Sequence, residues 1–382
     1  MRLALPSLLI LVYILVSFVS AMPSLPMARI AVGILLLVIS LKYIFYERIG
    51  GSFIAPDLPE PLLLLMEMLY AAMTILFFIL LLKDGLSLLL WLSRRLGTSW
   101  RFPFSPEVRS AGIVSTALAL AVFGTWQSVR VPDVRTVEIS LPRIPAALDG
   151  FSIIQITDIH IGPFLKGEWL RRVVERTNAL HPDLVALTGD LIDGAPDALK
   201  DDIVPLGELR ARYGVFGVTG NHEYYFQVQN WLPVFEQLGV TMLHNEHKTL
   251  SVGGRTDMVI AGIPDITETR FGGAGPDVHK ALDGSPNALR VLLAHRPNGA
   301  SSNNRADIQL SGHTHGGLLF FLKWLLASFN GGLVQGLYDV NGTTLYVSSG
   351  TGLWSGFSCR LGVPSEITCI VLRTPGKQPL PG

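Results

Sequence analysis

Four long apolar stretches in the first 130 residues limit what this chain can fold into. They cover residues 5–21, 28–46, 62–82 and 111–126. Because a helix rises about 1.5 Å per residue, about 20 residues cross the roughly 30 Å hydrocarbon core of a bilayer. We therefore expect a membrane region over residues 1–128 with four transmembrane helices. Four such stretches in succession would be unusual for the buried helices of a soluble domain.

Charged residues are distributed unevenly along the chain. The 30 Lys+Arg and 30 Asp+Glu give a net charge of zero. Residues 1–130 carry 10 basic and 6 acidic side chains, whereas residues 131–382 carry 20 and 24. A nucleic-acid-binding protein needs basic residues in excess to neutralise phosphates, so we expect no nucleic-acid partner. The mean hydropathy of +0.42 then reflects the first part, which is expected to lie in a lipid bilayer.

Basic residues in the loops predict how the helices are oriented. The connection 83–109 is the richest, with Lys83, Arg94, Arg95, Arg101 and Arg109. Such short basic loops stay in the cytoplasm. The fourth helix then runs outward, and the rest of a multi-pass inner-membrane protein is expected outside the cytoplasm. Alternatively, Met1–Ala21 is a cleaved signal peptide. That would leave three spans and a cytoplasmic second part, but the basic residues favour an uncleaved first helix.

After residue 150, five short β-branched runs are each followed by Asp, Asn or His side chains, which can bind metal ions or transfer protons. In open α/β sheets ligands bind outside the carboxyl ends of the strands, so these runs predict one shared site. The runs and the residues that follow them are Ser152–Thr157 before Asp158 and His160, Leu184–Thr188 before Asp190, Val215–Thr219 before Asn221 and His222, Arg290–Ala294 before His295, and Asp307–Ser311 before His313 and His315.

The residue types at these strand ends point to metal binding. Side chains alternate along an extended segment, so Asp158 and His160 face the same way, as do His313 and His315. Oxygen and nitrogen donors without thiolates suit divalent ions such as Mn, Fe, Zn or Co. The candidates are too many for one tetrahedral ion, and two ions can promote in-line displacement at phosphorus. Turn glycines that permit close backbone approach precede several of them: Gly189, Gly220 and Gly312.

These motifs are similar to a known family. Asp158-x-His160, Gly189-Asp190, Gly220-Asn221-His222-Glu223, His295 and Gly312-His313-x-His315 look like the five signature blocks of calcineurin-like metallophosphoesterases, in the same order. The resemblance covers about residues 150–373, and together with the spans it suggests a membrane-anchored branch. It implies an α/β fold: a four-layer α/β/β/α sandwich over residues 150–374, after a linker and first strand at 129–149 and before a tail at 375–382.

The same resemblance implies a role for each motif residue. Asp190 would bridge two divalent ions, and His222 would contact the scissile phosphate and help the leaving group depart without binding metal. A hydroxide between the ions would then attack a phosphomonoester or phosphodiester. The implied ligands are Asp158, His160, Asp190 and His315 for the first ion and Asp190, Asn221, His295 and His313 for the second.

Several nearby residues receive structural interpretations. Asp193 and Glu223 are expected to act behind the ligands or to be solvated. The pair His244 and His247 is expected in a solvated loop, and Arg360 in a surface or structural ion pair. The block after His295 departs from the family pattern with Arg296-Pro297-Asn298. Cys359 and Cys369 can form one disulfide or remain two buried thiols.

The predicted function is that of a membrane-anchored phosphoesterase. A lipid or lipid-linked phosphate is an attractive substrate because the anchor holds the domain near the bilayer. The apolar segment Leu318–Phe329 either meets lipid or forms a core helix. The alternative is a catalytically silent membrane sensor that binds metal or phosphate. No motif ligand is lost, which disfavours such a silent sensor. Transport by the helices has little support, because Glu67 is the single acid within the apolar stretches. The oligomeric state is left open.

Overall fold

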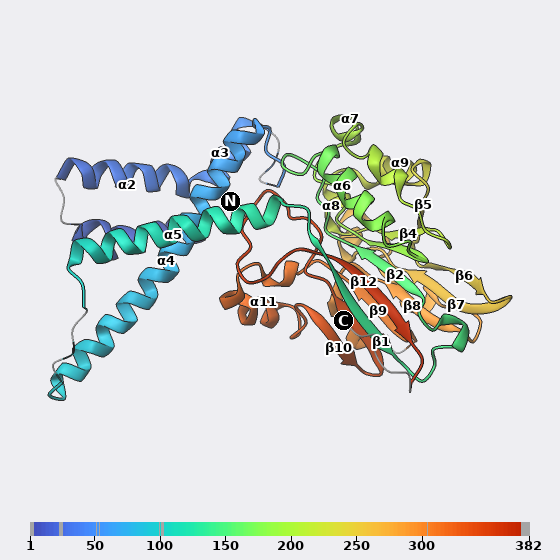
Figure 1. The fold of residues 1–382 in the computed structure, drawn as a ribbon. Helices are drawn as coiled ribbons and strands as arrows, with labels where there is room; N and C mark the ends of the chain where they lie inside the picture. The colour runs from blue at the N-terminus through green and yellow to red at the C-terminus, as the bar shows by residue number, and fades with distance from the viewer. Residues whose placement is uncertain are drawn as a thin grey trace. The chain divides into compact units, whose positions relative to one another are not determined.

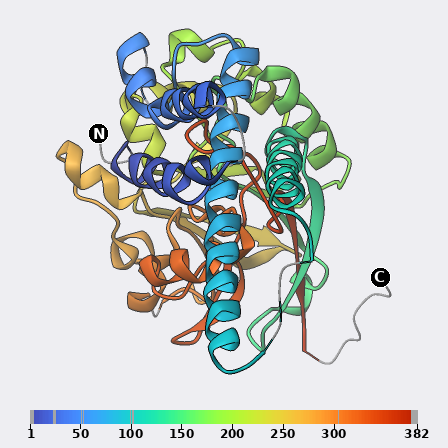
Figure 2. The same ribbon diagram turned by 90° about the vertical axis from the view of Figure 1, so that its left-hand side faces the viewer.

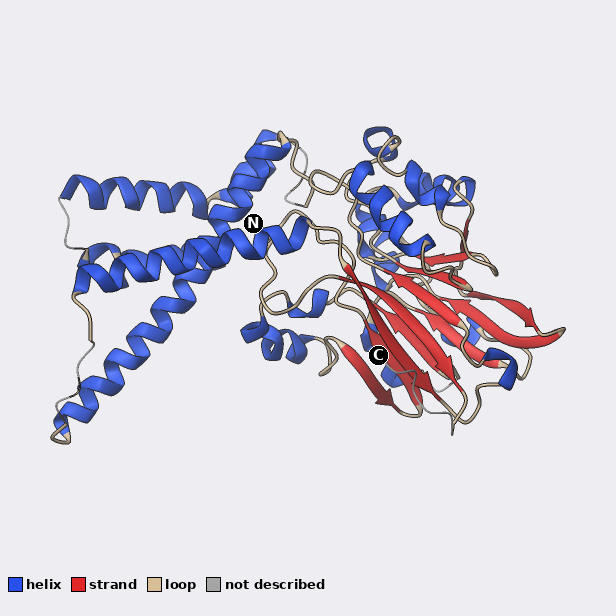
Figure 3. Ribbon diagram, in the orientation of Figure 1, coloured by secondary structure: helices blue, strands red, loops and turns tan. Residues whose placement is uncertain are grey.

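The computed structural model describes residues 4–375 except 23–25, 51, 53, 99, 101–102 and 304. Arg101 of the basic connection and nearly all of the predicted tail 375–382 therefore lie outside the described residues. The chain forms two compact units. The first comprises Met1–Ser128 and Ser355–Leu361, and the second comprises Val129–Trp354 and Gly362–Gly382. The helices before residue 130 belong to the first unit and the named strands to the second (Figure 3).

The helices of the first unit coincide with the four apolar stretches. They are α1 (Ala4–Ser17), α2 (Pro26–Ser40), α3 (Lys42–Ile49), α4 (Glu60–Arg95) and α5 (Pro106–Val129). Three helical segments are long and apolar enough to cross a membrane: Ala4–Ala21, Glu60–Arg95 and Pro106–Val129. The pair α2 and α3, bent by 55°, would make a fourth span. Within this unit α1 packs against α4, the long helix in Figure 2.

Two of these helices differ from the sequence-based boundaries. The third stretch continues through Gly85–Leu92 in one 36-residue helix, α4. Lys83 and Asp84 lie inside this helix and pair with each other at 2.8 Å, and Asp84 also accepts a hydrogen bond from Tyr13. The second stretch, predicted as one helix over 28–46, instead changes direction at Leu41.

The second unit contains two six-stranded sheets. The first has the order β1-β12-β2-β3-β4-β5 and the second β10-β11-β9-β8-β7-β6 (Figure 1). The strands of the first sheet are β1 (Asp133–Ser140), β2 (Ser152–Ile156), β3 (Leu184–Thr188), β4 (Val215–Val218), β5 (Val240–Met242) and β12 (Glu366–Arg373). Those of the second are β6 (Glu246–Val252), β7 (Arg255–Gly262), β8 (Leu289–Leu293), β9 (Ile308–Ser311), β10 (Gly336–Val340) and β11 (Thr343–Val347).

The two sheets share one hydrophobic core. Ile153 and Leu184 of the first sheet are buried in the same cluster as Val291 and Leu310 of the second. Helix α9 packs on β5, and α10 packs on β6 and β7. This arrangement confirms the predicted α/β/β/α sandwich. The helices of this unit are α6 (Gly167–Asn178), α7 (Pro196–Leu199), α8 (Asn221–Tyr225), α9 (Val228–Gln237), α10 (Val278–Ala281) and α11 (Lys323–Phe329).

The order of the strands explains why the motif residues can meet. Strands β2, β3 and β4 are parallel neighbours, as are β7, β8 and β9. Their carboxyl ends therefore lie at one edge of each sheet, and the loops that follow them converge. The five predicted runs match β2, β3, β4, β8 and β9 to within one residue at each end.

Candidate metal centre

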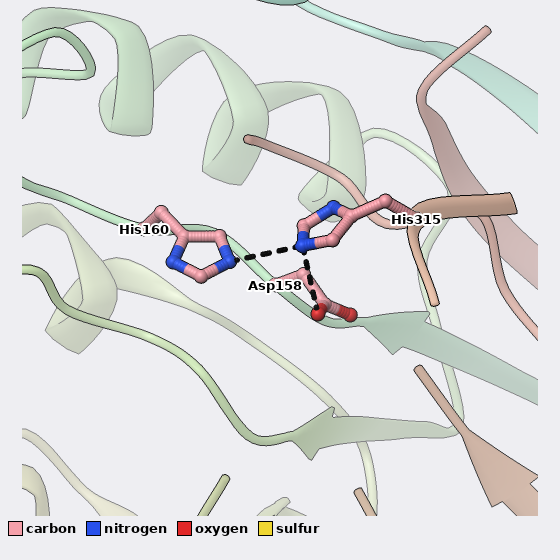
Figure 4. Close-up of side chains that lie close together, drawn as sticks. All are labelled: Asp158, His160 and His315. Carbon is pink, nitrogen blue, oxygen red and sulfur yellow. Dashed lines mark hydrogen bonds and ion pairs between the residues drawn. The ribbon is translucent and has the colours of Figure 1, made fainter. Parts of the chain in front are cut away.

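The loops after β2 and β9 bring three predicted ligands together. The Nε2 atom of His315 lies 3.5 Å from Asp158 Oδ1 and 3.3 Å from His160 Nε2, as the dashed lines in Figure 4 show. All three side chains are buried. Two imidazole nitrogens and a carboxylate oxygen thus point at one position, which is suited to a divalent cation.

A second group forms around the loops after β3, β8 and β9. His295 Nε2 lies 3.1 Å from Asp190 Oδ2 and 3.2 Å from His313 Nδ1. The same Asp190 oxygen lies 3.9 Å from His160 Nε2. Asp190 therefore stands between the two groups, in the place that a bridging carboxylate would occupy.

Asn221 begins helix α8 and is buried beside these groups. The backbone N–H of the next residue, His222, donates to Asp190 Oδ1 at 2.8 Å. The side-chain oxygen of Asn221 accepts a hydrogen bond of 3.2 Å from Arg296. The short helix thus brings Asn221 and His222 to the second group.

The backbone at the site adopts a conformation that non-glycine residues rarely use. Among the described residues, ten non-glycine positions have positive φ. Half of them are predicted ligands: Asp158, His160, Asp190, His313 and His315. Such conformations cost free energy and gather at functional sites, where the surrounding fold enforces them. The alternation expected for an extended segment therefore does not describe these turns, although the side chains still converge.

The turn glycines are required by close packing, as the sequence predicts. A Cβ atom at Gly189, whose φ is +89°, would lie 2.5 Å from the backbone nitrogen of Gly220. A Cβ at Gly220 would overlap the Asp190 carboxylate, and one at Gly312 would overlap that of Asp158.

Two buried acids form hydrogen bonds that orient the predicted ligands. Asp193 Oδ1 lies 3.1 Å from His160 Nδ1 and 2.5 Å from His222 Nδ1. It therefore fixes the ring of His160 with Nε2 free to bind metal. Glu223 accepts hydrogen bonds from the backbone nitrogens of Asp190, Leu191 and Gly220. Because both acids are buried, the alternative of solvated side chains is wrong.

The site perturbs the pKa values of its ionisable groups. Burial alone would raise the pKa of Asp190, but the neighbouring His295 and His222 bring it well below its ordinary value. Burial would lower the pKa of His222, whereas the carboxylates of Asp190 and Asp193 raise it to about 9. The pKa of His295 is raised to about 10, chiefly by Asp190 against the effect of burial. The buried carboxylates thus strongly favour positive charge beside them, which fits divalent cations.

Three residues near the site were not identified from the sequence as parts of it. Arg296 Nε donates to Asp265 at 2.7 Å, so the departure after His295 places a cation paired with Asp265 beside Asn221. The difference from the family pattern at Arg296-Pro297-Asn298 is the sequence signal that could have identified Arg296. The ring of Trp354 lies 6.4 Å from that of His222, and no motif or spacing marked this tryptophan.

Predictions outside the motif agree with the structure in some cases and need correction in others. His247 belongs to strand β6 rather than to a loop, and its Nδ1 lies 2.7 Å from the carbonyl oxygen of Ala281. His244 is half exposed and lies 3.2 Å from Glu268. Arg360 is buried, which excludes the surface alternative and leaves the structural ion pair as a prediction. Cys359 and Cys369 are free thiols, which was one of the two predicted alternatives.

Comparison with known proteins agrees with this site. The family model described as calcineurin-like phosphoesterase matches residues 151–317. The chain is 37% identical over 308 residues to the transmembrane protein with metallophosphoesterase domain of Bos taurus, covering 76% of this chain and 68% of that protein. An uncharacterised metallophosphoesterase of Campylobacter jejuni is 35% identical over 270 residues, with 68% and 69% covered. The chain thus spans about two thirds of the length of these relatives.

These similarities define the class of protein: a metallophosphoesterase with an intact set of motif residues. The chain belongs to the calcineurin-like metallophosphoesterase family, and the resemblance seen in the sequence is confirmed. Among solved structures, the NAD nucleotidase of Haemophilus influenzae is similar at a TM-score of 0.38 and 18% identity, covering 55% of this chain and 45% of that one. A likeness at this level carries no argument about substrate.

Proposed function

We propose that this protein is a membrane-anchored dinuclear phosphoesterase that hydrolyses a phosphomonoester or phosphodiester. One observation carries the proposal: Asp190 lies within 3.1 Å of His295 and 3.9 Å of His160, so one buried carboxylate joins two His/Asp groups. Bound divalent ions of the Mn, Fe, Zn or Co type would activate water and neutralise charge on the phosphate. The residues proposed to hold them are Asp158, His160, Asp190, Asn221, His295, His313 and His315.

His222 is the proposed general acid. Its Nδ1 contacts Asp193, which leaves Nε2 to carry the proton given to the leaving oxygen. Without metal, the carboxylates of Asp190 and Asp193 outweigh burial and raise the pKa of this imidazole to about 9. A buried, correctly oriented proton donor of this kind promotes departure of an alkoxide.

A lipid or lipid-linked phosphate is the proposed substrate class. None of the side chains of α11 is buried, which contradicts the alternative of a core helix. Trp324 and Phe329 are 71% and 72% exposed. Helix α5 ends at Val129 and β1 begins at Asp133, so at most about 15 Å of extended chain separates the last span from the catalytic unit. An apolar, aromatic surface on such a short tether is suited to the membrane interface.

The catalytic unit is proposed to lie outside the cytoplasm, because the basic connection 83–109 favours the cytoplasmic side. The test uses single cysteines in a chain with Cys359 and Cys369 replaced by serine. A cysteine at the exposed Lys200 should react with a membrane-impermeant maleimide in intact cells. One at the exposed Leu96 should react only after lysis. The reverse pattern would place the catalytic unit in the cytoplasm.

The activity itself is tested with the full-length protein in nanodiscs. After loading with Mn²⁺, the wild type should bind two ions per chain and cleave a chromogenic phosphodiester. Asp190→Ala should lose both ions and turnover, since one carboxylate serves both groups. Two bound ions without turnover on any phosphoester, soluble or lipid, would favour the silent sensor. Full activity of Asp190→Ala with metal re-supplied would contradict the bridging role.

A further inference from the structure

A buried ion pair lies within the helical unit. Lys42 Nζ, at the start of α3, lies 2.7 Å from Glu67 Oε1 of α4, and the two side chains are 1% and 0% exposed. Tyr46 also donates to Glu67 Oε1, at 2.9 Å. Charges in apolar surroundings are costly unless their remaining donors and acceptors are satisfied, and those within membrane helices are usually functional. The pair therefore needs an explanation beyond the packing of two helices.

The remaining hydrogen bonds of this pair go to a segment distant in the sequence. Residues 355–361, here called the returning segment, belong to the helical unit although the chain on both sides of it belongs to the catalytic unit. Lys42 Nζ donates to the carbonyl oxygen of Gly356 at 2.8 Å. The backbone N–H of Ser358 donates to Glu67 Oε2 at 3.2 Å. One charge thus holds a carbonyl and the other an amide of the same turn.

Further contacts from α3 and from a third helix, α5, hold the returning segment in place. Tyr43 of α3 donates to the same Gly356 carbonyl at 2.9 Å. The backbone N–H of Arg360 donates to the carbonyl oxygen of Gly124 in α5 at 2.9 Å. A Cβ atom at Gly124 would overlap the sulfur of Cys359, so the helix backbone approaches the segment closely. The returning segment is therefore bound by α3, α4 and α5.

The residues on either side of the returning segment belong to the catalytic unit and lie near its metal centre. Trp354 precedes it, with its ring 6.4 Å from that of His222. Two residues earlier, the backbone N–H of Gly352 donates to the carbonyl oxygen of Asp158 at 2.9 Å. On the other side, Val363 packs against Gly316, where a Cβ would lie 2.5 Å from Val363 Cγ1. The residues bordering the segment thus contact the neighbours of predicted ligands.

We propose that Lys42 and Glu67 are positioning residues for the phosphoesterase site. By binding the returning segment inside the helical unit, the pair holds Trp354 beside His222 and so shapes the position where substrate binds. The competing explanation is that the pair only stabilises the helices. This inference deepens the proposed function, and its first readout does not depend on turnover.

A charge swap separates the two explanations. Lys42→Glu with Glu67→Lys keeps an ion pair between α3 and α4. It places a carboxylate against the Gly356 carbonyl and an ammonium against the Ser358 N–H, so both contacts to the returning segment become repulsive. In nanodiscs the swapped protein should bind two metal ions per chain and insert normally. Amide hydrogen exchange in residues 355–361 should nevertheless be about tenfold faster or more, because at least two charge-assisted bonds are lost.

A milder pair of variants decides the question if the swap does not accumulate. Tyr43→Phe removes a hydroxyl that binds Gly356, whereas the control Ser40→Ala removes a hydrogen bond to the carbonyl oxygen of Leu37 within α2. Only Tyr43→Phe should speed exchange in residues 355–361, by about three- to tenfold, as expected for one hydrogen bond. Its KM should rise more than its kcat falls, with metal content unchanged.

Specific outcomes would overturn the inference. Wild-type exchange and KM in the charge swap, or equal exchange in Tyr43→Phe and Ser40→Ala, would show that the pair serves the helices alone. If the wild type itself bound metal without turnover, the proposed function would fail. The exchange measurements would still decide whether Lys42 and Glu67 hold the segment.

Discussion

His222 and Asp193 form a buried hydrogen-bonded pair in which Nδ1 and Oδ1 are 2.5 Å apart. The same carboxylate oxygen lies 3.1 Å from Nδ1 of His160. One acid therefore orients both the proposed general acid and a proposed metal ligand. The two imidazoles consequently depend on each other's geometry although each has a different role.

Replacing Asp193 should affect both roles at once. Asp193→Asn removes the charge that favours His222 in its protonated form and weakens the hold on His160. We expect about a 10- to 100-fold loss of activity, the range typical of residues behind metal ligands. Metal affinity should fall as well. Titration of Mn²⁺ binding together with kcat would check this, and unchanged values for both would show that Asp193 orients neither ring.

Removing His222 should affect proton transfer but not metal retention. His222→Ala should keep both ions and lose about 10²- to 10⁴-fold in kcat on substrates with poor leaving groups. The loss should be smaller for nitrophenolate, which departs without a proton. A series of aryl and alkyl phosphodiesters measures this dependence. The same loss for every leaving group would contradict the role of general acid.

Metal binding at the second group should release a proton. Burial would lower the pKa of His295, but the carboxylates of Asp190 and Asp158 raise it to about 10 in the absence of metal. Because a ligand imidazole must be neutral, metal displaces that proton at every pH below 10. Apparent affinity should therefore rise with pH, by about tenfold per unit for one proton, and level off above pH 10. Calorimetry at pH 6.5, 7.5 and 8.5 tests the slope, which a constant affinity would contradict.

Helix α11 should matter for lipid substrates and not for soluble ones. Trp324→Glu places a charge on a side chain that is 71% exposed, so folding should be unaffected while binding to an apolar interface weakens. Activity on a lipid phosphate in vesicles should fall about tenfold or more relative to a soluble diester. Val204→Glu, at an exposed apolar residue of the catalytic unit, is the matched control. Equal effects of the two substitutions on both substrates would remove the case for lipid.

Much of the fold and the motif residues could be predicted because the signals are local. Apolar length alone marks the helices of the first unit, and short β-branched runs ending in Asp, Asn or His mark β2, β3, β4, β8 and β9. Helix ends were predicted less well. The third apolar stretch is predicted over 62–82, whereas α4 continues to Arg95 with Lys83 and Asp84 inside it.

The sequence by itself determined that this chain has apolar helices, a phosphoesterase domain and the residue types of a metal site. Only the tertiary structure decided which side chains form hydrogen bonds to those residues and to the segments around them. Asp193 contacts two histidines, and Arg296 pairs with Asp265. Lys42 binds Gly356 across 314 residues of sequence. Such contacts depend on the folded path of the chain and leave no periodic pattern or motif, so residue order alone does not reveal them.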